Sequence, residues 1–149
     1  MRNLIIDLDA IAYNLDVMRQ RAGGVKVCGV VKANAYGHGM IEVARKLEEA
    51  GVDYLGVADV AEALELRRAG IDAPILAWLH DPQEMFIEAL NEGIELGLAN
   101  EDHLARVAAA AEITGRLARV HLKVDTGLNR NGASAAEWEG VLRQARALV

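Results

Sequence analysis

Residues 30–39 read V-V-K-A-N-A-Y-G-H-G, and they are the most informative part of this sequence. An apolar run over residues 25–31 ends in Lys32, and a short loop with two glycines follows. Such a run predicts a strand buried on both faces, as in parallel sheets. Lys32 at its end is a candidate nucleophile if its amine is desolvated, although a merely solvated lysine fits the same pattern.

The composition is that of a globular domain large enough to bury a core. The chain has 149 residues, of which 52% are hydrophobic and 26% charged. A formal net charge of -6 argues against a nucleic-acid surface or a membrane-binding patch. We expect neither a signal peptide nor a membrane span. The single cysteine, Cys28, lies in the first apolar run, so we expect it to be buried and the protein to be cytoplasmic.

Strand patterns and helix patterns alternate along the rest of the chain. Strands are predicted over residues 25–31, 54–58, 74–79, 95–99 and 119–125, and helices over 7–22, 40–51, 59–70, 81–93, 100–114 and from 134 onward. Capping signals open four of these helices, at Asp7, at Asp59 with Glu62, at Asp81 with Pro82 and Glu84, and at Ser134 with Glu137. This alternation predicts βαβ units and an α/β fold with a parallel sheet.

Two architectures fit this alternation. An open doubly wound sheet is one, but no G-x-G-x-x-G follows the first strand. A (β/α)8 barrel is the other, and it needs about 250 residues. The periodicity does not choose between them, and no break in composition indicates an internal domain boundary.

The strand predicted over residues 119–125 has two different faces. Arg119, His121, Lys123 and Asp125 alternate with apolar residues, so they share one face. A polar face suits the interior of a barrel, and it equally suits a solvated edge strand. The loop T-G-L-N-R-N-G (residues 126–132) follows, and its Arg130 could bind a carboxylate or a phosphate.

Together, V-V-K-A-N-A-Y-G-H-G, H-L-K-V-D-T-G-L-N-R-N-G (residues 121–132) and the opening D-L-D-A-I-A-Y-N-L (residues 7–15) resemble the alanine racemase family of fold-type III pyridoxal-phosphate enzymes. The resemblance implies that residues 1–149 form the N-terminal part of a TIM (β/α)8 barrel, about five βα units, without the rest of the barrel and the C-terminal β-domain. Small pyridoxal-phosphate homeostasis proteins share the lysine motif but lack K-V-D-T-G-x-x-R, which makes them the weaker alternative.

The resemblance also implies roles for single residues. Lys32 matches the lysine that binds pyridoxal 5'-phosphate covalently and then serves as an acid/base catalyst. Tyr36 matches the tyrosine whose hydroxyl contacts the cofactor phosphate. Arg130 matches the arginine near the cofactor's phenolic oxygen and the substrate carboxylate. Lys123 matches a lysine that is carbamylated in many members, which would give it a charge opposite to that of Arg130.

Other polar residues near these motifs have structural interpretations. We expect Asn34 and His38 to shape the loop after Lys32, and Asp125 to fix its own loop. His80, His103 and His121 show no metal-ligand spacing, so no metal site is predicted. Leu128 and Asn131 stand where the family commonly has methionine and leucine, a difference that concerns packing.

The activity implied by the resemblance is the interconversion of L-alanine and D-alanine for peptidoglycan synthesis, by a homodimer. The second catalytic tyrosine of the family would lie outside these 149 residues. We therefore expect the chain as given to be an inactive fragment of such an enzyme, and a non-catalytic fragment that binds no cofactor remains the alternative.

Overall fold

The structure, a computed structural model, describes residues 3–148. The chain divides into two compact units, Met1–Leu76 and Ala77–Val149, and each is described by itself. The strands form one sheet in the order β1-β2-β3-β4-β5, the order of the sequence. The predicted α/β fold with a parallel sheet is confirmed.

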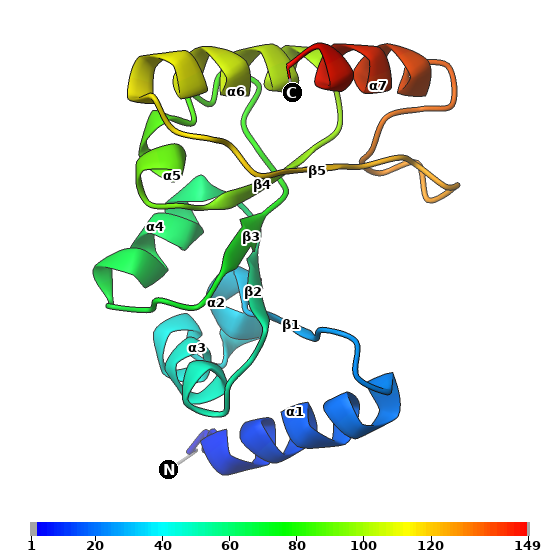
Figure 1. Cartoon of the computed structure of the whole chain (residues 1–149). Helices are drawn as coiled ribbons and strands as arrows, with labels where there is room; N and C mark the ends of the chain where they lie inside the picture. The colour runs from blue at the N-terminus through cyan, green and yellow to red at the C-terminus, as the bar shows by residue number, and fades with distance from the viewer. Residues whose placement is uncertain (1–2, 149) are drawn as a thin grey trace. The chain divides into compact units, whose positions relative to one another are not determined.

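The first unit is built on two parallel strands, with Cys28 opposite Tyr54 in the register. Both strands and the helices around them are labelled in Figure 1. The elements are α1 (Leu8–Ala22), β1 (Cys28–Val30), α2 (Lys32–Gly37), α3 (Met40–Glu49), β2 (Tyr54–Val57) and α4 (Val60–Arg68). The predicted N-caps Asp7 and Asp59 are present, because the N–H of Ala10 donates to Asp7 and the N–H of Glu62 donates to Asp59. The other half of the predicted capping box differs, because the Glu62 carboxylate accepts from the N–H groups of Ala33 and Ala58.

Helix α3 packs closely against β1. A Cβ atom on Gly29 would lie only 2.8 Å from Leu47 Cδ1, so the glycine leaves the room that the helix needs. Polar side chains join α3 to α1 as well. Lys46 Nζ lies 2.5 Å from Asp9 Oδ1, and Arg19 donates to the carbonyl of Ala50.

The prediction of a first strand buried on both faces is wrong. Strand β1 spans only Cys28–Val30, and both of these residues are exposed, whereas Val31 is fully buried. The face that carries Gly29 packs against α3, while that of Cys28 and Val30 is open in the part of the chain described here. A hydrophobic run is buried on both faces only where elements cover both of them, and in the part of the chain described here α3 packs on the Gly29 face.

The second unit is built on β4 and β5, which are parallel, with Leu96 opposite Val120. Helix α6 contacts both α5 and α7, and all three helices are labelled in Figure 1. The elements are β3 (Ile75–Ala77), which links the two units, α5 (Ile87–Asn91), β4 (Glu95–Leu98), α6 (Glu101–Thr114), β5 (Val120–Leu122) and α7 (Trp138–Ala147). Strand β4 is buried throughout and lies at the centre of this unit.

The capping box predicted before the last helix is present. Ser134 Oγ donates to Glu137 Oε2 (2.7 Å), and the Ser134 N–H donates to the same oxygen (2.9 Å). Helix α7 itself begins at Trp138, whose N–H donates to the Ser134 carbonyl.

The helix predicted to begin at Asp81 is wrong. Asp81 Oδ1 accepts a hydrogen bond from the Gln83 N–H (2.8 Å), which makes a turn, and α5 begins only after Phe86. Phe86 has a left-handed φ of 56° and is buried, with its ring edge-to-face against those of His80 and His103. Burial of this aromatic ring fixes the path of the chain and overrides the local capping signal.

No helix within residues 3–148 is both long and apolar enough to cross a membrane.

Candidate active site

Lys32 follows β1, with only Val31 between the strand and the lysine. The Val31 N–H donates to the Gly56 carbonyl (2.8 Å), so the backbone is tied to β2 up to the residue before the lysine. The Lys32 side chain is half-buried, and its Nζ lies 4.9 Å from the centroid of the Tyr36 ring. The structure therefore brings together the two residues that the sequence assigned to the cofactor in this unit, the ammonium facing an aromatic ring.

The backbone after Lys32 forms a left-handed turn. Residues 33–36, none of them glycine, have φ values between 51° and 56°. A left-handed conformation costs a non-glycine residue about 1–2 kcal/mol, so the surrounding structure must hold this turn in place. The sequence predicted a loop here but not its handedness, because Ala-Asn-Ala-Tyr carries no signal for four left-handed residues in a row.

Asn34 and His38 hold this turn from within. The Met40 N–H donates to Asn34 Oδ1 (2.8 Å), which supplies a cap at the start of α3, and the Gly39 N–H donates to the Asn34 carbonyl (3.0 Å). His38 Nδ1 donates to the Ala35 carbonyl (2.8 Å). The prediction that these two side chains shape the loop is confirmed.

Glu62 also contacts the turn, and sequence reasoning missed it. The Ala33 N–H donates to Glu62 Oε1 (2.7 Å), and the Ala58 N–H donates to Glu62 Oε2 (2.8 Å). The sequence assigned Glu62 to a capping box, in which it would accept from the N–H of Asp59. One sequence signal could have indicated this contact: Glu62 lies in the first turn of the helix that follows β2, close to the carboxyl ends of the strands.

In the second unit, Lys123 follows β5 and is half-buried. Its Nζ donates to the Trp78 carbonyl (2.7 Å). A Cβ atom on Gly97 would lie 3.2 Å from Lys123 Cδ and 2.8 Å from Trp78 Cβ, so this glycine makes the room in which the two meet. The pKa of Lys123 lies below its ordinary value, first because burial desolvates the ammonium and second because Arg130 adds a like charge.

The loop that carries Arg130 is closed at its base. The Asp125 N–H donates to the Ala133 carbonyl (2.8 Å), and the Ala133 N–H donates to the Lys123 carbonyl (2.8 Å). Asp125 Oδ1 accepts from the Gly127 N–H (2.8 Å), and hydrogen bonds from the loop amides hold the pKa of this carboxyl below its usual value. The predicted role of Asp125 in fixing its loop is confirmed, and Arg130 is presented to solvent by an ordered loop.

The predicted division of the fifth strand into two faces is confirmed as well. His121 Nε2 lies 2.7 Å from Oε2 of the buried Glu95, on the face that also carries Lys123. Val120 lies on the other face and lines an apolar groove with Leu104 and Val107 of α6. His121 has the structural role predicted for it, as the partner of Glu95. Within residues 3–148, no group of three or more His, Cys, Asp or Glu side chains could hold a metal ion.

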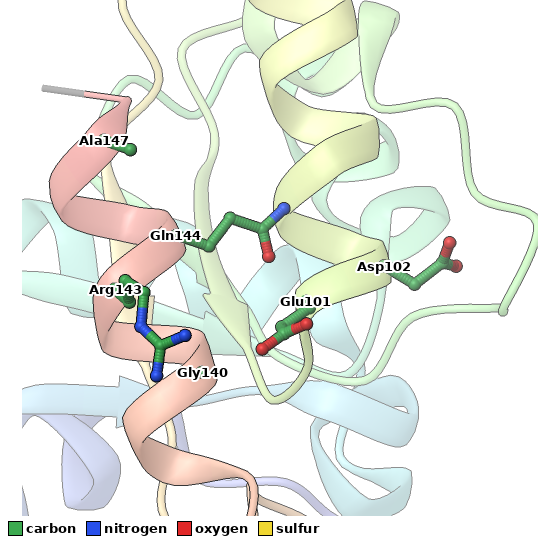
Figure 2. A pocket seen from close by; sticks show the side chains of 6 residues that line it. All are labelled: Glu101, Asp102, Gly140, Arg143, Gln144 and Ala147. Carbon is green, nitrogen blue, oxygen red and sulfur yellow. The ribbon is translucent and has the colours of Figure 1, made fainter.

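A separate open groove lies between α6 and α7 (Figure 2). Glu101 and Asp102 are in the first turn of α6, where the helix dipole favours negative charge. Figure 2 shows the Glu101 carboxylate beside Gly140, which has no side chain to occupy the same space. The features of this groove are explained by helix packing.

The fold and these residues define the class of protein. The sheet is parallel, Lys32 follows its first strand, and the loop that carries Arg130 follows its fifth. These residues therefore lie at the carboxyl ends of strands, which is where (β/α)8-barrel enzymes carry their catalytic residues. Residues 6–149 match the family described as alanine racemase, N-terminal domain. The chain belongs to this family.

Individual relatives agree with this assignment. The chain is 53% identical over 133 residues to alanine racemase from Thermobifida fusca, which covers 89% of this chain and 36% of that protein. It is 49% identical over 146 residues to alanine racemase from Mycolicibacterium smegmatis, covering 96% and 38%.

Solved structures give the same result. Alanine racemase from Streptomyces lavendulae superposes with a TM-score of 0.93 at 45% identity, over 96% of this chain and 37% of that one. The enzyme from Streptomyces coelicolor gives a TM-score of 0.92 at 39% identity, over 96% and 39%. The predicted fold, the N-terminal portion of an alanine racemase barrel, is confirmed, and the chain spans less than two-fifths of the length of these relatives.

Proposed function

We propose that residues 1–149 form the N-terminal part of the barrel of a pyridoxal-phosphate-dependent alanine racemase. The enzyme would interconvert L-alanine and D-alanine and supply D-alanine for peptidoglycan. The observation that carries the proposal is Lys32, whose amine lies at the carboxyl end of β1 beside Tyr36, in a chain of the alanine racemase family.

The residues beside Lys32 fit the proposed cofactor, which has an aldehyde and a phosphate. A half-buried primary amine is the group that an aldehyde requires, and Lys32 offers one on a backbone held by hydrogen bonds. Tyr36 is exposed and adjacent, so its hydroxyl is free to donate to a phosphate oxygen. When bound, the cofactor supplies an electron sink that stabilises negative charge at the substrate Cα.

The chain's own residues would then bind the substrate and move its proton. We propose that Lys32 Nζ removes and returns the proton on Cα as a general acid/base on one face of the substrate. Arg130 would bind the substrate carboxylate and the cofactor's phenolic oxygen, because a guanidinium can donate two parallel hydrogen bonds to such a group. The closed base of its loop keeps Arg130 in a defined place.

We propose that Lys123 is a site of carbamylation. The reaction needs a neutral amine, whose lone pair attacks carbon dioxide, forming an N–C bond and releasing one proton from the nitrogen. Burial and the charge of Arg130 lower the pKa of Lys123 and so increase its neutral fraction at neutral pH. The product is an anion that attracts Arg130, where the ammonium repelled it.

Partners and location belong to the same proposal. We propose a cytoplasmic homodimer that acts on a free amino acid and binds neither nucleic acid nor membrane. The net charge of -6 supports the exclusion of polyanionic partners.

The test compares Lys32→Ala with Lys26→Ala in the full-length protein. Lys26 is a matched control, because it is an exposed lysine whose Nζ also lies over an aromatic ring, that of Tyr54 at 5.5 Å. Borohydride reduction with pyridoxal phosphate should fix the cofactor on Lys32, as seen by peptide mass, in the wild type and in Lys26→Ala. Racemisation, followed by chiral chromatography, should be lost in Lys32→Ala.

Racemisation by Lys32→Ala without added amine would contradict the assigned role. A wild-type protein that traps no cofactor would favour the alternative of a non-catalytic chain.

A further inference from the structure

We propose that Glu62 is a positioning residue for Lys32, which it serves by holding the left-handed turn that follows the lysine. This inference rests on the proposed function of Lys32 and adds to it a residue on a different element, helix α4. The Glu62 carboxylate accepts two hydrogen bonds, both from backbone amides outside its own helix.

The two bonds join the carboxyl ends of neighbouring strands. Glu62 Oε1 accepts from the Ala33 N–H at 2.7 Å, in the peptide unit that directly follows Lys32. Glu62 Oε2 accepts from the Ala58 N–H at 2.8 Å, directly after β2. One carboxylate therefore links the backbone at Lys32 to the backbone at the end of β2.

The position of Glu62 is itself fixed. Its own N–H donates to the N-cap residue Asp59 (2.9 Å), and its side chain is half-buried. The neighbours Ala63 and Leu64 are buried, so the first turns of α4 are anchored in the unit. A carboxylate on this helix is a rigid acceptor, unlike one on a mobile loop.

The turn needs such an acceptor because its conformation is unfavourable. Ala33 is the first of the left-handed residues, with φ 51° and ψ 52°, and it has a Cβ that disfavours this region. The peptide between Lys32 and Ala33 can rotate away unless its N–H is held. Rotation of that peptide changes ψ of Lys32 and φ of Ala33, so the chain after the lysine would leave in another direction. The Tyr36 ring, which the turn holds 4.9 Å from Lys32 Nζ, would then no longer face the amine.

The ordinary capping role does not explain this geometry. In a capping box, Glu62 would accept from the N–H of the N-cap residue, Asp59. Here both carboxylate oxygens accept from amides outside the helix, and one of these amides follows Lys32. The arrangement connects α4 to the lysine.

The test uses Glu62→Gln, which keeps the size of the side chain but has one oxygen where the carboxylate has two. Glu65→Gln is the matched control, on the same helix with an exposed side chain. Amide hydrogen exchange of the native full-length protein should show faster exchange at Ala33 or Ala58 in Glu62→Gln, by about tenfold to a hundredfold, because a bond to a charged acceptor is lost. Glu65→Gln should match the wild type at both amides.

The second measurement is the rate at which pyridoxal phosphate is captured on Lys32, trapped by borohydride across a range of pH. For positioning, Glu62→Gln should lower this rate about tenfold at every pH and keep the shape of the pH profile. A purely electrostatic influence on the lysine would shift the profile along the pH axis, and a purely structural role would lower the urea midpoint but leave the capture rate of the folded protein unchanged. Either result would overturn the proposal.

Glu62→Asp keeps the charge but shortens the reach by one methylene, so it should also slow capture. The same measurements distinguish a failure of this proposal from a failure of the proposed function. In the latter case the wild type captures no cofactor on Lys32, while exchange at Ala33 still reports whether Glu62 holds the turn. Unchanged exchange at both amides in Glu62→Gln would refute the hydrogen bonds on which the proposal rests.

Discussion

Gly132→Ala should open the loop that carries Arg130, and Gly127→Ala in the same loop should not. Both glycines have positive φ, 119° at Gly132 and 128° at Gly127, so both substitutions strain the backbone by about 1–3 kcal/mol. They differ in what the new Cβ meets. At Gly132 it would lie 2.6 Å from Asp125 N and 2.8 Å from the Val124 carbonyl carbon, whereas at Gly127 no atom lies within 4 Å.

The overlap at Gly132 is with backbone, which cannot rotate away as a side chain can. Overpacking of this kind costs about 1–3 kcal/mol, so the total for Gly132→Ala is about 2–6 kcal/mol. With a urea m-value of about 1–3 kcal/mol per molar, the two variants should differ in midpoint by about 1 M. The chain can relieve the overlap by breaking the bonds between Asp125 and Ala133 at the base of the loop.

Urea unfolding of the native protein measures the free energies, and amide exchange at Asp125 and Ala133 measures the opening. An open loop withdraws Arg130, so the pKa of Lys123 should rise toward its ordinary value in Gly132→Ala. Equal destabilisation by the two variants would refute the reasoning, because it would mean that backbone strain, and not overlap at the base of the loop, sets the cost.

Three further predictions concern the same unit. Gly97→Ala should destabilise the protein by about 1–3 kcal/mol in urea unfolding, because its Cβ would overlap Trp78 and the stem of Lys123; no change would show that both can move aside. The pKa of Lys123 in the folded protein lies below the ordinary 10.5. As the pH rises from this lowered pKa to 10.5, the wild type should therefore gain stability relative to Lys123→Met. Curves of stability against pH that run parallel for the two proteins would contradict this. The folded pKa of Asp125 lies below the ordinary 3.8, so its stabilising contribution is present above pH 3.8 and is lost as pH falls through the lowered value. Asp125→Asn should therefore flatten the acid limb of stability against pH, and an unchanged limb would show that the loop amides do not favour the charged carboxylate.

The sequence predicted those parts of the fold that depend on local signals. Asp7 and Asp59 cap helices as their positions indicated, and the alternation of residues 119–125 placed His121 and Lys123 on one face. These features are decided by neighbours in the chain, within a helical turn or along one strand.

The sequence failed where distant residues decide the outcome. The run over residues 25–31 is hydrophobic enough for a buried strand, yet Val30 is 39% exposed because burial depends on what covers each face. At Asp81 the capping signal was overridden by the burial of Phe86. The local sequence pattern does not show which distant residues cover a strand face or pack against an aromatic ring.

The candidate site divides in the same way. Lys32 and Arg130 could be named from their motifs, and the roles of Asn34 and Asp125 followed from the turn-forming character of their side chains. Glu62 was placed on the correct helix and given the wrong partner, because its bond to Ala33 spans 29 positions of sequence. Long-range hydrogen bonds of this kind leave no trace in residue spacing.

The left-handed turn after Lys32 has a consequence for the order in which the protein assembles. A free chain would rarely visit four consecutive left-handed residues, since their combined cost is about 4–8 kcal/mol. The acceptor for the Ala33 N–H becomes available only when α4 has formed, and Val31 is tied down only when β2 has paired with β1. We therefore expect the turn beside the lysine to form only after these elements are in place, so that a partly folded chain presents Lys32 as an ordinary flexible amine.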